Sequence, residues 1–441
     1  LNYRAGAENE LDALVSIIGI LLSLEVCRRV LGWAMTLIGV AMIGYAYFGP
    51  YLPEIIAHRG FGIDRLCTAL YLTTNGVFGV MANVLATYVI LFIFVGAFLQ
   101  RSGAGQFFID LPMALAGKST GGPAKVAVMA SALFGSVSGS AIANTVSTGA
   151  FTIPLMKRAG FRPHVAGAIE PSASIGGMFM PPIMGAGGFL MAELTETPYA
   201  YIMMIAIAPA MLYFFSVFCM IHFEAKKHKI EGIRDPDAPT AWQVLKHEWF
   251  YALPLVIITV LMIIGKSPGY SAFWATLSCI AVGWIRKGER TAPRDLWIFV
   301  PPAAILLVMV AGKMPGGYAF YGTAAATVWC LGVSAFRKNT AMGLAEIWAS
   351  IQTGARNTLI IGATLGVIGI IVGTISLTGI GLKFSEIIIS LAGGNLLAAI
   401  LLVGVASLVL GMGVPVTAAY LITAVLAVPP LTEMGVVLIA A

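Results

Sequence analysis

The sequence has few charged residues. Asp, Glu, Lys and Arg make up 10% of its 441 residues, 59% are hydrophobic, and the mean hydropathy is +0.91. Because soluble domains carry about 25% charged residues, this composition excludes an ordinary soluble protein and predicts an all-α polytopic membrane protein. The net charge of +6 is modest, and the Lys and Arg lie in short loops between apolar runs. That pattern sets membrane topology and gives no reason to expect a nucleic-acid surface.

The sequence also lacks the residue patterns of several kinds of site. Its five cysteines are scattered and form no CxxC pair, so we expect neither a disulfide framework nor a zinc site. It contains no HExxH motif and no phosphate-binding GxxxxGK[ST] motif. These absences argue against zinc-dependent hydrolysis and against ATP-driven transport by this chain. We therefore expect that the chain is not an enzyme and has no organic cofactor.

Gly, Ser and Thr are instead concentrated in two stretches inside long apolar runs, GSVSGSAIANTVSTG at 135–149 and PSASIGGMFMPP at 171–182. Gly and Pro open a helix backbone, and at membrane depth an open backbone must lie inside protein or beside a wet cavity. The second stretch is predicted to break its helix at residues 172–177 and again at Pro181 and Pro182. Two such breaks predict a binding site. The alternative is two close helix contacts made by small residues.

Apolar runs predict the order of the remaining segments. Residues 32–51 should span the membrane after a charged turn at Glu25, Arg28 and Arg29, and residues 53–72 should form an interfacial arm. Residues 123–134 and 141–156 should form a re-entrant hairpin whose basic ends lie in the cytoplasm. The other predicted helices are 77–99, 107–116 (too short to cross), 199–222, four plain helices at 251–264, 270–285, 297–311 and 318–336, then 348–377, 384–391, and a second hairpin of 396–410 and 421–428 ended by Pro429, Pro430 and Glu433.

The second hairpin repeats the first. Residues 93–117 resemble residues 370–394, with Gly105 and Gly381, and Gly117 and Gly393, each 276 residues apart. The same offset carries Gly135 onto Gly411, so that hairpin tip falls on hairpin tip. Charge places the two copies in opposite orientations, which is typical of secondary transporters. The predicted domains are residues 1–73, the first repeat at 74–222, loop and scaffold helices at 223–345, and the second repeat at 346–441.

Neutral oxygens near the breaks suit a hard cation such as sodium, although a single Ser or Thr usually bonds to its own helix. The predicted cation ligands in the first repeat are Gly135, Ser136, Ser138, Ser172, Ser174, Gly176 and Gly177. Glu170 is the one acidic residue beside a broken segment. It is either a proton or cation site, or a headgroup-level residue paired with Lys157, Arg158 or Arg162; the sequence favours the second.

Three runs carry a family resemblance: GSVSGSAIANTVSTGAFTIPLMKRAGF, SASIGGMFMPPIMGAGGFLMAE and GMGVPVTAAYLI. They resemble the large membrane subunit of the TRAP (tripartite ATP-independent periplasmic) transporters. The run GARNTLIIGATLGVIGIIVGTISLTGIGLKFS resembles the TAXI branch, in which small and large subunits are fused. The resemblance implies an elevator-type fold with inverted repeats in the cytoplasmic (inner) membrane of a bacterium or archaeon. It also implies import of a small carboxylate from a TAXI-type periplasmic binding protein, by symport with sodium ions.

The same resemblance implies a substrate site at Ser140, Asn144, Thr148, Pro181 and Thr417, and a second sodium site at Gly411, Gly413 and Thr417. Met178 and Val416 stand where the family commonly has polar residues. Both ends of the chain look cut from something longer, so the second site is expected to be incomplete. A proton-coupled carrier, an ion channel on the same repeats and an intramembrane enzyme remain as alternatives.

Overall fold

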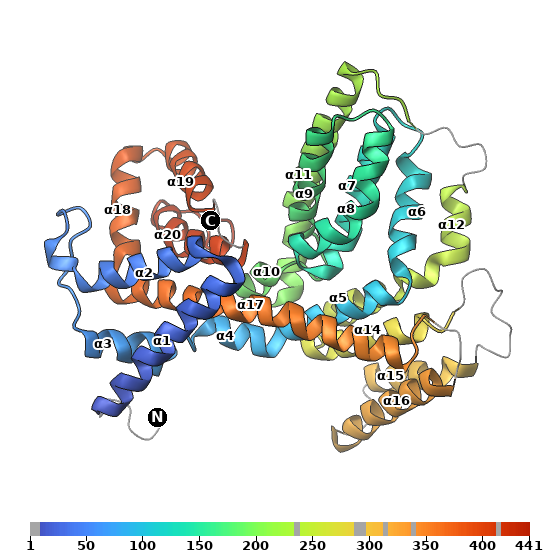
Figure 1. Ribbon diagram of the computed structural model, residues 1–441, viewed down its shortest axis with the longest axis horizontal. Coiled ribbons are helices and arrows are strands. Elements are labelled where there is room, and N and C mark those ends of the chain that lie inside the picture. Colours follow the sequence, from blue (N-terminus) through green and yellow to red (C-terminus); the bar gives the residue numbers. More distant parts are fainter. Residues whose placement is uncertain (1–8, 233–238, 286–296, 312–315, 337–340, 412–415) are drawn as a thin grey trace. The chain divides into compact units, whose positions relative to one another are not determined.

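The computed structural model describes residues 9–232, 239–285, 297–311, 316–336, 341–411 and 416–441. Within these ranges every regular element is a helix, which confirms the predicted all-α class (Figure 1). The chain packs as two compact units. Unit 1 comprises Leu1–Val89, Phe189–Thr197 and Asn357–Ala441, and unit 2 comprises Ile90–Gly188 and Pro198–Arg356.

Unit 1 contains the N-terminal helices and the last helices of the chain. Gly369 and Gly373 of the long helix α17 (Leu344–Thr378) pack against the backbone of the turn at Asn75 and Gly76. A Cβ at Gly369 would lie 2.4 Å from the Gly76 carbonyl oxygen. Its elements are α1 (Glu10–Leu31), α2 (Trp33–Tyr47), a 3-10 turn (Gly49–Tyr51), α3 (Ile63–Cys67), α4 (Val80–Val84), π-helical turns at Thr68–Leu72 and Leu85–Val89, α18 (Ile380–Ala392), α19 (Leu396–Gly411) and α20 (Val416–Glu433).

Unit 2 contains the first predicted hairpin and the plain helices. The buried Trp284 indole donates a hydrogen bond to Ser334 Oγ at 2.9 Å. This bond connects the loop that follows α14 (Pro268–Val282) with helix α16 (Gly316–Phe336). Its elements are α5 (Ile90–Arg101), α6 (Ala104–Ala116), α7 (Gly122–Ser138), α8 (Ala141–Arg158), α9 (Pro163–Gly177), α11 (Tyr199–Lys227), α12 (Ala241–Glu248), a 3-10 turn (Trp249–Ala252), α13 (Leu253–Ile263), α14 (Pro268–Val282), α15 (Val300–Val310) and α16 (Gly316–Phe336). Helices α10 (Ala186–Leu194) and α17 (Leu344–Thr378) have residues in both units.

Among the described residues, five helical stretches are long and apolar enough to cross a membrane: Val80–Arg101, Tyr199–Lys227, Ala241–Ile263, Ala319–Phe336 and Leu344–Thr378. They confirm the predicted polytopic character, since a spanning helix needs about 20 apolar residues. The predicted span at 32–51 is wrong, because α2 has 15 residues. The predicted charged turn is also wrong. Glu25 lies inside α1, where it accepts hydrogen bonds from Arg28 and Arg29, which hold the pKa of its carboxyl at about 2.

The predicted break at residues 172–177 is wrong, because α9 continues to Gly177. Its small residues pack against neighbouring helices instead of opening the backbone: a Cβ on Gly176 would lie 2.5 Å from the Tyr213 ring. The helix is instead interrupted at 178–185, as Pro181 and Pro182 predicted. The peptide bond between these two prolines is cis. The last helix, α20, ends at Glu433 as predicted, but Pro429 and Pro430 lie inside it and do not end it.

Candidate functional site

Helices α7, α8 and α9 pack against one another, with α11 beside α9 and α7 (Figure 1). The turn between α7 and α8 is built by Gly139, which adopts φ +61° and donates its N–H to the Gly135 carbonyl at 3.2 Å. A left-handed cap of this kind favours glycine. Ser140 then caps α8 by accepting from Ala143 N–H at 3.3 Å. The structure confirms that α7 and α8 form a helical hairpin, but the predicted tip at Gly135 to Ser138 is wrong, because α7 continues to Ser138 and the turn is at Gly139 and Ser140.

Two glycines let α7 and α9 cross at backbone contact. A Cβ added to Gly177 would lie 2.7 Å from Gly135 Cα and 2.9 Å from the Ser131 carbonyl oxygen. Asn144 of α8 closes this crossing, because its amide donates to the Ser131 carbonyl at 2.8 Å and is fully buried. The small-residue contact that the sequence left as an alternative therefore describes Gly135 and Gly177 correctly.

A carboxylate lies in the middle of the same three helices. Glu170 of α9 is fully buried and accepts hydrogen bonds from Ser131 Oγ of α7 at 2.6 Å, from Thr148 Oγ1 of α8, and from Thr152 Oγ1 of α8 at 2.5 Å. Ser174 Oγ lies 3.5 Å from the same carboxylate. We call Ser131, Thr148, Thr152, Glu170 and Ser174 the carboxylate–hydroxyl cluster. The same four helices also form an apolar core that includes Ala127, Met156, Ala173 and Phe214.

The non-helical segment after α9 lies against the hairpin tip. Ile183 N–H donates to the Ser136 carbonyl at 3.1 Å, and Tyr199 O–H of α11 donates to the carbonyls of Pro182, at 3.2 Å, and Ile183. Within the described part of the chain, the carbonyls of Met180 and Pro181 accept no hydrogen bond. Both residues are half-buried.

The structure brings some predicted site residues together and separates others. Gly135, Ser136 and Gly177 lie where the end of α7 meets the segment after α9. The hydroxyls of Ser136 and Ser172 each donate to a carbonyl of their own helix, Leu133 O and Ala168 O, at 2.8 Å. Asn144 and Thr148 lie beside Glu170 with their polar groups engaged by the protein. Gly411 belongs to unit 1. Gly413 and the side chains of Ser138 and Thr417 lie outside the described residues.

The favoured interpretation of Glu170, at headgroup level with a basic partner, is wrong. Its carboxylate is fully buried, and among the described residues its partners are hydroxyls only. Ser131 and Thr152 were not predicted as site residues. One signal was available: Thr148 and Thr152 are four residues apart and so share a helix face. What the sequence could not give is the rotation of α7 and α9 that turns Ser131 and Glu170 toward that face.

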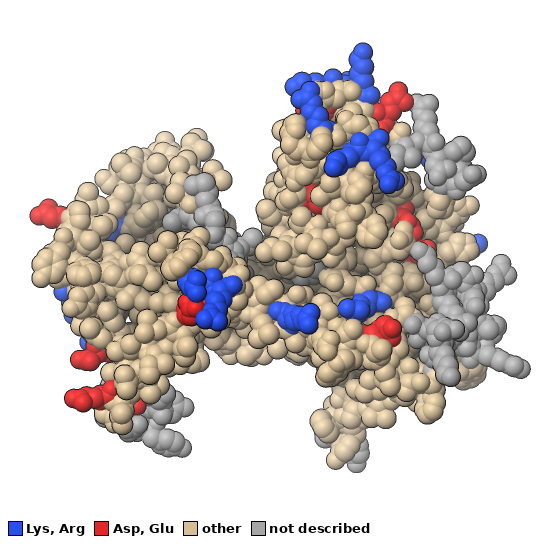
Figure 2. Space-filling model, in the orientation of Figure 1, with Lys and Arg blue, Asp and Glu red and all other residues tan. Residues whose placement is uncertain are grey.

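Basic residues gather at one end of this bundle, where α8 and α11 finish and α9 begins (Figure 2). Lys157 and Arg158 close α8, Arg162 precedes α9, and Lys226 and Lys227 close α11. Glu170 lies eight positions after Arg162 along α9, which is about 12 Å at the usual rise per residue. The cluster is therefore more than two helical turns from the end that the positive-inside rule assigns to the cytoplasm.

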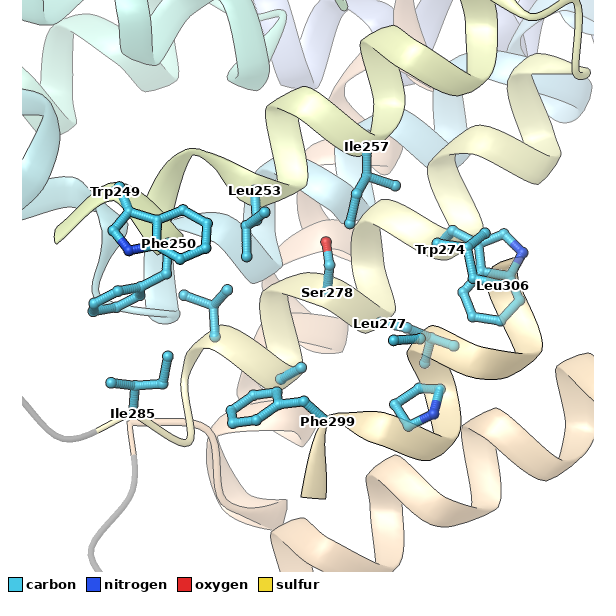
Figure 3. A pocket seen from close by; sticks show the side chains of 14 residues that line it. Trp249, Phe250, Leu253, Ile257, Trp274, Leu277, Ser278, Ile285, Phe299 and Leu306 are labelled. Atoms are coloured by element: carbon cyan, nitrogen blue, oxygen red, sulfur yellow. The ribbon is translucent and has the colours of Figure 1, made fainter. Parts of the chain in front are cut away.

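A cavity of about 580 Å³ lies elsewhere in unit 2, among the plain helices (Figure 3). Its lining comes from α13, α14, α15 and the turn before α13, and is almost entirely apolar, with Ser278 its one hydroxyl. Because a carboxylate needs donors that converge on it, this cavity does not fit an anionic substrate. The junction of hairpin tip and break, with the carboxylate–hydroxyl cluster beside it, is the better candidate.

Comparison with known proteins gives the family. Residues 18–294 and 289–441 match the family described as "Tripartite ATP-independent periplasmic transporter, DctM component". The chain is 26% identical over 169 residues to the 2,3-diketo-L-gulonate TRAP transporter large permease protein YiaN of Escherichia coli, covering 38% of this chain and 39% of that protein. It is 23% identical over 257 residues, 58% of each chain, to the sialic acid TRAP transporter large permease protein SiaM of Vibrio cholerae.

A third relative, the C4-dicarboxylate TRAP transporter large permease protein DctM of Pseudomonas aeruginosa, is 28% identical over 142 residues, 32% of this chain and 33% of that protein. Each of these matches covers less than two thirds of the relative's own length. The family match, by contrast, extends over nearly the whole sequence from residue 18 to residue 441. The chain is therefore a multi-pass membrane protein that belongs to the DctM component family of the tripartite ATP-independent periplasmic transporters.

Proposed function

We propose that the chain is the permease of a secondary transporter in the bacterial inner membrane, which imports a small organic anion driven by a sodium gradient. The observation that carries this proposal is the junction of hairpin tip and break in unit 2. There the Ser136 carbonyl accepts a hydrogen bond from Ile183 N–H, and among the described residues the carbonyls of Met180 and Pro181 accept no backbone hydrogen bond. Open carbonyls beside a broken helix are a usual sodium site in transporters. The predicted residues Gly135, Ser136, Gly177 and Pro181 surround this junction.

The substrate class and partner follow from the relatives by analogy. The names of three relatives refer to a diketo-gulonate, a sialic acid and C4-dicarboxylates, which share a carboxylate. A periplasmic binding protein would deliver such an anion to the permease, and the TAXI-like run in α17 makes a TAXI-type binding protein our expectation. Ser140 and the N-terminus of α8 supply a partial positive charge toward which a carboxylate could point.

An elevator motion on inverted repeats is part of the same proposal. It is supported by the two short helices α6 and α18, which have 13 residues each, follow a left-handed glycine at Gly103 and Gly379, and are 276 residues apart. The hairpins and the segment after α9 would move, while the N-terminal helices and the plain helices would stay in place. This division remains a prediction.

Proton coupling is the second candidate, and one observation favours it. Glu170 is a fully buried carboxylate that accepts hydrogen bonds from hydroxyls and, among the described residues, forms no ion pair with a basic side chain. Ionisable groups inside membrane proteins often belong to ion or proton pathways. An ion channel on the same repeats is the third candidate. An assay that varies the gradient and the binding protein separately distinguishes the three.

We expect uptake of the binding protein's ligand into proteoliposomes to require both that protein and an inward ion gradient. The binding protein encoded beside this gene and its own bound acid are the reagents. A sodium gradient at equal pH should support uptake, and collapse of the gradient with a sodium ionophore should stop it. Uptake that follows only a pH gradient would replace sodium by protons. Ion currents without the binding protein would make the chain a channel.

A further inference from the structure

The apolar cavity of unit 2 runs along the plain helices and has two distinct ends. Figure 3 shows Trp249, Phe250 and Ile285 at one end and Trp274 at the other. Its lining residues on α14 extend from Trp274 to Val282, which is eight positions, or about 12 Å at the usual helical rise. Half of a bilayer's hydrocarbon core is about 15 Å thick, so the cavity has about the depth of one leaflet.

The wall of this cavity suits a hydrocarbon chain. On one side the wall is α13, which belongs to the candidate span Ala241–Ile263. Among the described residues that line the cavity none is charged, and Ser278, which carries the one hydroxyl, already donates to the Ala275 carbonyl of its own helix at 2.7 Å. A polar ligand would lose its hydrogen bonds to water and find few partners here, whereas an apolar chain loses none.

The Trp249 end of the cavity has the features of a membrane–water interface. Trp249 is exposed although it lines the cavity, and tryptophans gather where hydrocarbon meets headgroups. Lys246 lies three and four positions before Trp249 and Phe250, which places it on their side of the helical stretch. The neighbouring acid, Glu248, has one carboxylate oxygen buried, whereas the Lys246 side chain is exposed. Positive charge is therefore available at the mouth of the cavity.

We propose that this cavity binds one acyl chain of a phospholipid, whose phosphate lies beside Lys246. The chain enters past Trp249 and Phe250 and ends near Trp274. A phosphate is a strong acceptor for a lysine ammonium, and the flexible lysine stem lets the ammonium reach the level of the headgroups. The basic end of α11 precedes this end of the cavity in the sequence, and the positive-inside rule therefore assigns the lipid to the cytoplasmic leaflet.

The charge at the mouth decides between the possible occupants, because any apolar group would satisfy the lining. A phospholipid brings a phosphate to Lys246. A second copy of this chain has a net charge of +6, and its basic residues would face the same side of the membrane. The inference goes beyond the proposed transport function, because a lipid can bind to a chain that transports nothing.

Native mass spectrometry of the purified, delipidated full chain tests the site, with palmitoyl-oleoyl phosphatidylglycerol as the probe. We expect one lipid to bind each chain before any other does. Figure 3 shows Ile257 and Ser278 pointing toward each other, so Ile257→Trp should fill the cavity. It should weaken the first binding at least about tenfold, the effect of displacing two methylene groups of the chain.

Val256→Trp is the matched control, because Val256 is adjacent, exposed and outside the lining. It should bind the first lipid as the unmodified protein does. Equal first binding in Ile257→Trp and Val256→Trp, or no distinct first lipid in the unmodified protein, would overturn the proposal. A dimer of the unmodified chain that Ile257→Trp dissociates would also overturn it, in favour of a second copy as the occupant.

A second pair of variants tests the phosphate contact without altering the cavity. Lys246→Gln should weaken the first phosphatidylglycerol about 2- to 5-fold, as loss of an exposed charge contact usually does. Palmitoyl-oleoyl glycerol, which has the same chains and no phosphate, should bind Lys246→Gln and the unmodified protein equally. Lys266→Gln, which removes the lysine beyond the other end of α13, should leave both lipids unaffected. No loss in Lys246→Gln, or an equal loss with both lipids, would overturn the placement of the phosphate.

Discussion

Glu170→Gln is expected to lower ion-driven uptake by about 5- to 150-fold, the range that a coupling free energy of 1–3 kcal/mol produces. The amide has nearly the same shape as the acid and still offers an oxygen to Ser131 or Thr148, so the bundle should fold. It carries no negative charge and cannot gain or lose a proton, so any coupling of ion movement through this carboxylate is lost. Initial uptake rates of the binding protein's ligand into proteoliposomes, measured from acid to alkaline pH, give the result.

The pH profile separates a coupling role from a structural one. If Glu170 carries a proton, the profile of Glu170→Gln should be flat, Glu170→Asp should restore part of the slope, and Glu224→Gln should match the unmodified protein. If Glu170 only packs, its variant should transport more slowly with an unchanged profile. A Glu170→Gln protein with normal rate and normal profile would remove the carboxylate from the mechanism.

Gly177→Ala is expected to lower the free energy of unfolding by about 1–3 kcal/mol, as overpacking usually does. The new Cβ would lie 2.7 Å from Gly135 Cα and 2.9 Å from the Ser131 carbonyl oxygen. Both are backbone atoms, which cannot turn aside as the end of a side chain can. The helices would have to separate, and the Asn144 hydrogen bond across the crossing would lengthen. Uptake should fall with stability, since the hairpin tip rests on this crossing.

Gly167→Ala is the matched control, because it makes the same change on the same helix. A Cβ there meets nothing within 4 Å, and alanine favours a helix by about 0.5–1 kcal/mol over glycine. The melting temperature of the purified protein should therefore fall in Gly177→Ala and stay level or rise in Gly167→Ala. Equal melting temperatures in the two variants would mean that α7 and α9 do not cross as described.

Composition and glycine patterns predicted much of this fold. Long apolar runs predicted the plain helices and α17, and two half-length runs joined by a Gly- and Ser-rich stretch predicted the hairpin, because these are local properties of the chain. Local signals failed where packing overrides propensity. Gly176 and Gly177 looked like a break, yet they remain helical because their missing side chains admit Tyr213 and Gly135. The break falls where two prolines remove backbone donors.

The candidate site was predictable in part, for the same reason. The sequence identified the hairpin tip and the segment near Pro181 as one region, because both interrupt apolar runs. It could not place Glu170, whose surroundings depend on how three helices rotate against one another. The residues next to Glu170 in the sequence are compatible with a buried position and with a position at the membrane surface. Only the contacts with Ser131, Thr148 and Thr152 distinguish the two.

The central claim is that this chain couples cation entry to anion entry through the α7–α8–α9 bundle. The most direct measurement records substrate uptake, internal sodium and internal pH together in one proteoliposome preparation, with the loaded binding protein outside. The account predicts that cations enter only with substrate, in a fixed ratio, and that Glu170→Gln removes the proton share of that ratio. Cation entry without substrate or without the binding protein, or substrate uptake without any cation, would contradict it.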